Sequence, residues 1–138
     1  MDQAASQRGG FEPIPAETEE LAARLIEAAF RVHRGTGPGL LESVYQACMC
    51  YELDQEKLPY EHEVDLPVEY HGVRLRAGLR LDIWAGRQVI LELKAVDKVL
   101  PIHKAQLLTY MKLTGCRIGF IINFNVPRLK DGIVRMVR

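Results

Sequence analysis

The sequence predicts an α/β fold of the α+β type, with a central mixed β-sheet flanked by helices. Two helical patterns occupy residues 17–57, strand-like segments follow from residue 60 to 96, and a helix and an apolar strand come after them. Apolar residues make up 48% of the 138 residues, which is enough for one domain with its own core. Residues 1–16, rich in Gly, Gln and Pro, are expected to form a flexible tail, leaving residues 17–138 as a single domain.

The composition narrows the class of protein. Eighteen basic and eighteen acidic residues give zero net charge, so binding to a polyanion would require a local basic patch. The apolar residues are spread too evenly for a membrane span, and no apolar run typical of a signal peptide opens the chain. The three cysteines show no metal-binding spacing. We therefore expect a cytoplasmic protein with reduced thiols and no membrane contact.

Two helices are expected first. One begins near Thr18 and ends in the glycine-rich loop at residues 34–39, and the second covers residues 40–57. Glu42 stands in the first turn of the second helix, either as an exposed acid favoured by the helix dipole or as a carboxylate leaning towards a functional site. The apolar residues expected on the buried face of this helix are Leu41, Val44, Tyr45, Cys48, Met49 and Leu53.

Three strands are expected next, at residues 60–70, 73–82 and 88–96. Pro67 places the pairing of the first strand near an edge or a bulge. Period-two alternation in the second strand puts Asp82 on a polar face with Arg76 and Arg80. These arginines form either a solvated surface or a stripe that contacts phosphates.

The segment from Arg80 to Val96 carries the clearest functional signal. It reads as two strands joined by a tight turn at Ala85–Arg87, and Glu92 and Lys94 share one face of the second strand. The turn brings Asp82 opposite a residue between Val89 and Glu92. Two carboxylates held this close repel each other unless a cation lies between them, and hard oxygen ligands suit Mg²⁺ or Mn²⁺. The alternative is a strand edge with one solvent-facing ion pair.

A third helix is expected over residues 101–113, followed by a buried strand at 117–124 and a short strand at 132–138. Gln106 and Tyr110 lie four residues apart, hence on one face of this helix. They are read either as an exposed glutamine beside a packing tyrosine or as functional residues. The side chains expected to pack on the sheet are Ile102, Ala105, Leu108 and Met111.

The order of these elements resembles the core of the PD-(D/E)XK nuclease superfamily, which has a restriction-endonuclease-like fold. Residues 39–45 read Gly-Leu-Leu-Glu-Ser-Val-Tyr and resemble the signature of the GxxExxY proteins, a small family placed in that superfamily. Residues 106–110 fit the Q-x-x-x-Y motif of lambda-exonuclease-like and RecB-like nucleases. Leu81 stands where the superfamily name has proline. The resemblance covers most of the chain, from about Glu19 to Val137.

The resemblance implies a role for each matched position. Asp82 and Glu92 would be metal ligands, with the Leu93 carbonyl as a third, and Lys94 would position or activate the attacking water. Glu42 would assist the metal or the water. The remaining residues, which would orient the active site or contact the DNA backbone, are Gln106 and Tyr110, with Arg76 and Arg80 as further nucleic-acid contacts.

The leading hypothesis is a Mg²⁺- or Mn²⁺-dependent nuclease, a hydrolase of phosphodiester bonds acting on DNA. A second hypothesis is a catalytically silent module that keeps the fold and binds nucleic acid or a protein partner. A third is a subunit of a homodimer or larger complex in which another chain completes the DNA groove. The rival fold is a generic α+β domain in which Glu92 and Lys94 are ordinary surface charges.

Overall fold

The computed structural model describes residues 12–138, apart from the side chains of Arg76 and Ala77. The helices are α2 (Ala16–Thr36), α3 (Glu42–Gln55) and α4 (Pro101–Thr114), with a short 3₁₀ helix η1 (Leu129–Gly132) before the last strand. The strands are β1 (Tyr60–Tyr70), β2 (Val73–Ala85), β3 (Val89–Lys94), β4 (Ile118–Asn123) and β5 (Ile133–Val137). Residues 1–11 of the expected tail lie outside the described part, and Ala16 already belongs to α2.

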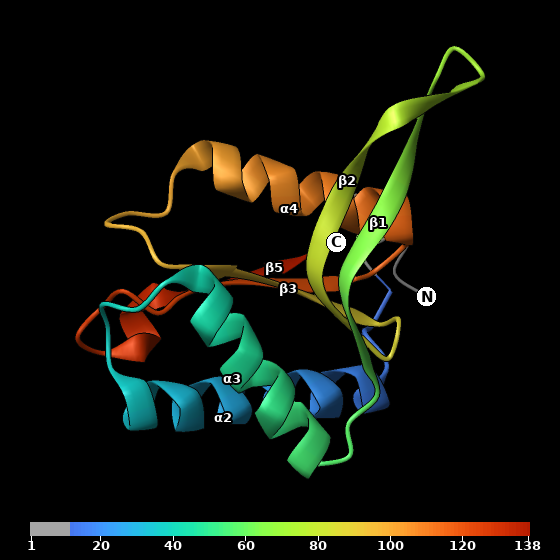
Figure 1. Ribbon diagram of the computed structural model, residues 1–138. Coiled ribbons are helices and arrows are strands. Elements are labelled where there is room, and N and C mark those ends of the chain that lie inside the picture. Colours follow the sequence, from blue (N-terminus) through green and yellow to red (C-terminus); the bar gives the residue numbers. More distant parts are fainter. Residues whose placement is uncertain (1–11) are drawn as a thin grey trace, which may run out of the picture.

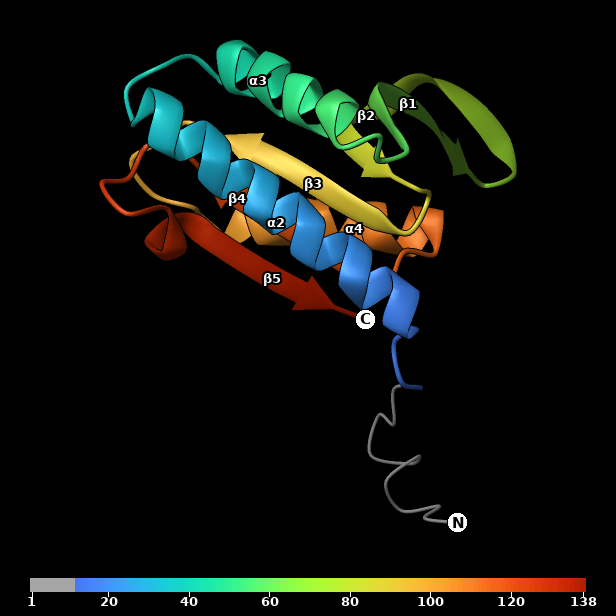
Figure 2. The same ribbon diagram turned by 90° about the horizontal axis from the view of Figure 1, so that it is seen from below.

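The strands form a five-stranded mixed sheet in the order β1-β2-β3-β4-β5. The β3–β4 pair is parallel, and the other three pairs are antiparallel. Helices α2 and α3 cover one face of the sheet, and α4 covers the other (Figures 1 and 2). Helix α4 is the crossover that parallel strands require. This arrangement confirms the predicted fold class.

The helix α3 packs on the sheet through a narrower stripe than its sequence suggested. Tyr45, Met49 and Leu53 are buried, as expected, but Leu41 is 73% and Val44 is 40% exposed. The buried residues recur every four positions, so they follow one side of the helix. Val44 lies one position before Tyr45 and so off that line, and Leu41 is the N-cap with an extended backbone, so it precedes the first turn of the helix.

The contact face of α4 was predicted wrongly in part. Leu107 and Met111 are fully buried on the sheet, whereas Ile102 is 57% exposed and Ala105 is exposed as well. Leu107 also lies beside Gly119, where an added Cβ would stand 2.8 Å from a Leu107 methyl carbon. The absence of a side chain at Gly119 lets α4 approach β4 closely, and this close approach selects which face of the helix is buried.

The β2–β3 hairpin turns as predicted. Gly86 and Arg87 both have positive φ, 55° and 54°, and Gln88 N donates to Ala85 O at 2.9 Å. Beyond this hairpin, β1 and the first part of β2 project from the molecule as a two-stranded ribbon (Figure 1). The β1–β2 register shifts between Pro67 and Glu69 on the edge strand, which confirms the expectation for Pro67.

No helix within residues 12–138 combines the length and the apolar character needed to cross a membrane.

Candidate active site

Two carboxylates stand where β2 and β3 separate. The last paired residues are Ile83 and Leu91, so Asp82 and Glu92 face each other one position further on. Asp82 N donates to Glu92 Oε2 at 3.0 Å, and Leu93 N donates to Asp82 Oδ2 at 2.8 Å. The two side chains therefore take over the hydrogen bonds that the backbone of the separating strands no longer makes.

Burial makes these carboxylates costly. Glu92 is 7% exposed and is the one buried carboxylate or basic side chain in the described residues. Burial raises its pKa to about 8, and the negative charge of Asp82 adds to the rise. Burial raises the pKa of Asp82 as well. The positive charge of Lys94 lowers the pKa of both groups.

Glu42 reaches the same place from α3. Its Oε2 accepts a hydrogen bond from Ala95 N at 3.2 Å, directly after the end of β3. Its charge also raises the pKa of Asp82 and Glu92. Glu42 thus reaches the end of β3 from α3, and its charge acts on the two strand carboxylates.

The two residues predicted on α4, Gln106 and Tyr110, differ in their relation to the carboxylates. Burial raises the pKa of Tyr110, and the negative charges of Glu92 and Asp82 raise it further. Gln106 is exposed one turn earlier on the helix and makes no hydrogen bond to the described residues. Backbone hydrogen bonds or mutual charge effects thus connect five of the six side chains expected in the active site, and Gln106 has no such connection among the described residues.

The expected arginine stripe is not continuous with Asp82. Arg80 is exposed and pairs with Asp65 at 3.1 Å, whereas Asp82 is half-buried and turns inward. Strict alternation fails here, because Leu81 and Trp84 pack in the same cluster beneath α4 although they lie three residues apart. The placement of Asp82 on a polar face with Arg80 was therefore wrong. The side chain of Arg76 lies outside the described part.

The oxygen donors fit a hard divalent ion. Asp82 and Glu92 each use one oxygen for a backbone N–H, and their second oxygens have no hydrogen-bond partner among the described residues. No three His, Cys, Asp or Glu side chains between residues 12 and 138 are grouped closely enough to hold a metal by themselves. A bound ion would therefore combine these carboxylates with backbone or water oxygens, as Mg²⁺ commonly does.

Two further residues of this site were missed in the sequence. Glu63 stands opposite Asp82 on β1 with a φ of 51°, and its charge raises the pKa of Asp82. The position of Glu63 opposite Asp82 depends on the register between β1 and β2, which no local sequence pattern reveals. Asn123 is 2% exposed and binds Val96 through both amide atoms, at 3.1 Å to N and 2.8 Å to O. The signal available in the sequence was a polar amide side chain, Asn123, at the end of an otherwise apolar strand.

The fold, the paired strand carboxylates and the neighbouring lysine agree with a comparison of the whole sequence against protein families. A family model described as the PD-(D/E)XK nuclease superfamily matches residues 19–136. Neither the curated proteins nor the solved structures contain a significant match. The match spans the three helices and all five strands apart from the first turn of α2 and the final residues. The chain therefore belongs to the PD-(D/E)XK nuclease superfamily.

Proposed function

We propose that this protein is a metal-dependent nuclease that hydrolyses phosphodiester bonds in DNA with Mg²⁺ or Mn²⁺. One observation carries the proposal: Asp82 accepts from Leu93 N and Glu92 accepts from Asp82 N where their two strands separate, and the charge of Lys94 acts on both carboxylates. Such a concentration of negative charge in a half-buried place is unfavourable for a folded chain alone, and it suits a site that binds a dication.

The residues divide the work as follows. Asp82 and Glu92, with the Leu93 carbonyl, would hold the ion, which when bound neutralises phosphate charge and makes water more nucleophilic, and Glu42 would assist through a water molecule on the ion. Lys94 holds the attacking water and stabilises the negative charge that develops on the phosphate. Tyr110 and Gln106 orient the site from α4 or contact the DNA backbone.

The arginines of β2 would extend the DNA contact beyond the reacting phosphate. Arg80 is 60% exposed on its side chain and is held by one exposed acid, Asp65. Such a pair is weak in water, so a phosphate can replace Asp65 at small cost. Arg76 is proposed for the same contact from its position in the sequence.

We further assign the chain to the GxxExxY group within the superfamily. The three fixed positions of that motif are Gly39, Glu42 and Tyr45, and each has its own structural reason in this protein. Gly39 has a φ of 102°, which a residue with a side chain rarely adopts. Glu42 reaches Ala95 N at the end of β3, and Tyr45 is fully buried beneath the loop that leads to Glu42.

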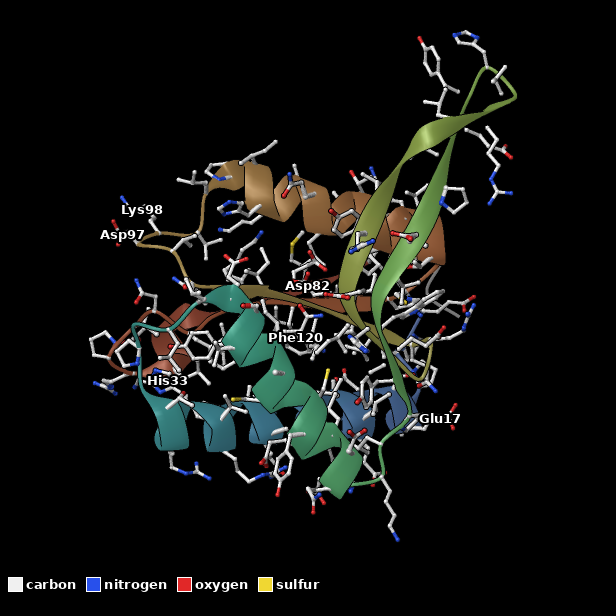
Figure 3. The ribbon with its side chains drawn as sticks, in the orientation of Figure 1. Glu17, His33, Asp82, Asp97, Lys98 and Phe120 are labelled. Carbon is white, nitrogen blue, oxygen red and sulfur yellow. The ribbon has the colours of Figure 1, made fainter. Side chains whose placement is uncertain are left out.

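The nuclease proposal is tested with purified protein, plasmid DNA and linear duplex DNA, with Mg²⁺, with Mn²⁺ and with EDTA. Lys94→Ala should lower cleavage by about 10²–10³-fold, as the loss of one charge-stabilising group does in other enzymes. Lys98→Ala is the matched control, because Lys98 lies on the outer loop between β3 and α4, while Asp82 lies near the centre of the molecule (Figure 3). Equal cleavage by the wild type and Lys94→Ala would contradict the proposal.

A catalytically silent binding module is the second candidate. The observation that favours it is that Asp82, Glu92 and Glu42 each already accept a backbone hydrogen bond, so the fold closes without an ion. Calorimetric titration with Mn²⁺ separates the two functions. Binding that Asp82→Asn removes supports the nuclease, whereas DNA binding without any ion uptake supports the module. Light scattering with and without DNA tests whether a homodimer completes the groove.

A further inference from the structure

Tyr45 is buried between the two segments that carry Glu42 and Lys94. Its hydroxyl donates to Gly37 O at 2.6 Å and accepts from Leu40 N at 3.2 Å. Both atoms belong to the loop between α2 and α3, which ends one residue before Glu42. The N-cap of α3, Leu41, makes no side-chain capping bond, so the Tyr45 hydroxyl is the side chain that ties this loop to the helix.

The aromatic ring of Tyr45 is connected to the segment that carries Lys94. It stacks on Phe124 with ring centroids 4.5 Å apart and an angle of 7° between the planes. Both rings are fully buried. Phe124 N donates to Lys94 O at 2.9 Å, so the position of Phe124 is tied to the backbone of Lys94. The two ends of one side chain thus meet the two segments that approach the site from different layers.

We propose that Tyr45 is a positioning residue that sets the Glu42 carboxylate relative to Lys94 at the end of β3. It acts through the loop at residues 37–40 and through Phe124, and it does not contact the substrate. This inference rests on the proposed function for its kinetic consequence. It also has a structural consequence that needs no catalysis, because the Glu42 carboxylate accepts the Ala95 N–H while Asp82 accepts the Leu93 N–H.

The first experiment compares these two amides by hydrogen exchange followed by NMR. Tyr45→Phe removes the hydroxyl and keeps the ring stack. Tyr60→Phe is the matched control, because its hydroxyl binds Asp54 at 2.7 Å on the far end of α3. We expect Ala95 N–H to exchange about fivefold faster in Tyr45→Phe, the effect of weakening one hydrogen bond, and Leu93 N–H to stay unchanged. Tyr60→Phe should change neither amide.

An unchanged Ala95 amide would overturn the proposal. A similar acceleration of both amides would overturn it too, since the hydroxyl would then only stabilise the fold as a whole. Glu42→Gln gives the reference for a weakened bond to Ala95, and the pattern of Tyr45→Phe should resemble it.

The second experiment measures cleavage kinetics and Mn²⁺ binding. Tyr45→Phe should lower kcat about tenfold with KM and the Mn²⁺ dissociation constant within twofold of the wild type, because only the placement of the reacting groups changes. A rise in KM with kcat unchanged would contradict positioning. If the wild type itself cleaves no DNA, the proposed nuclease function fails, while the exchange result still decides the role of Tyr45.

Discussion

Charged side chains are paired at one end of the β2–β3 hairpin, the turn at Gly86 and Arg87, and crowded at its open end, where Asp82 and Glu92 lie. At the turn, Arg87 makes two hydrogen bonds to Glu61, at 3.0 and 3.1 Å, and its guanidinium lies 4.3 Å from the centre of the Trp84 ring. At the open end, Asp82, Glu92 and Glu42 share one nearby lysine. The charges of the turn are paired in solvent, whereas those of the open end gather with an excess of negative charge in a half-buried place.

The two ends of the hairpin therefore differ in how their charged groups affect the stability of the fold. Paired surface charges contribute little either way, but crowded carboxylates away from water destabilise a metal-free chain. We therefore place the proposed functional chemistry at the open end, which is held together by the hydrophobic contacts around it. Four sets of measurements test whether the two ends of the hairpin differ in this way.

The largest effect is expected at Asp82. Asp82→Asn keeps an oxygen for Leu93 N but removes the charge, so the fold should persist while cleavage falls about 10³-fold, a loss of about 4 kcal/mol in the barrier. Asp65→Asn is the control, since Asp65 is an exposed acid that pairs with Arg80. Rates on supercoiled plasmid with Mg²⁺ provide the measurement. Comparable losses in both variants would erase the contrast between the site and its surroundings.

A large cost to stability is expected at Leu91, which is fully buried in the last pair before the strands separate. Leu91→Ala should lower the free energy of unfolding by about 2–5 kcal/mol, because it leaves a cavity in the core. Leu113→Ala, at a residue 51% exposed, should change it by less than about 0.5 kcal/mol. Urea denaturation followed by circular dichroism measures both. A small effect at Leu91 would mean that the packing does not hold the open end.

The pH dependence of stability should show how much ionised Glu92 destabilises the fold. The pKa of Glu92 is raised from 4.5 to about 8 in the folded, metal-free chain. Between these values the folded chain keeps a proton that the unfolded chain has lost, so stability falls as pH rises from 5 to 8. We expect a fall on the order of 2–4 kcal/mol in EDTA.

Glu92→Gln cannot ionise and should remove most of that slope, and Mg²⁺ should restore stability to the wild type at pH 8. Urea denaturation at several pH values, with and without Mg²⁺, tests both statements. The same slope in the wild type and Glu92→Gln would assign the pH dependence to other groups.

The smallest effect is expected at the turn. Arg87→Gln breaks an ion pair whose side chains are 65% and 44% exposed, so the free energy of unfolding should fall by less than about 1 kcal/mol, with cleavage unchanged. Thermal denaturation and the plasmid assay provide the two readings. A loss of cleavage would show that the two ends of the hairpin are coupled.

Local patterns in the sequence were enough to predict most of the elements. The three helices, the turn at Gly86 and the strands were expected close to their observed bounds, because each depends on spacing between neighbours in the chain. The faces of α3 and α4 were less predictable. Both helices carry apolar residues on more than one side, and only close packing, such as that of Leu107 beside Gly119, selects the buried side.

The order of the elements and the Glu-x-Lys strand with its neighbouring aspartate follow from the amino-acid sequence alone. Tertiary structure alone decided the register that sets Asp82 opposite Glu92, the approach of Glu42 to Ala95 and the presence of Glu63 near Asp82. These contacts join residues from separate layers and strands, and their geometry depends on how the sheet bends and how the helices pack upon it. No periodicity along the chain encodes such distances.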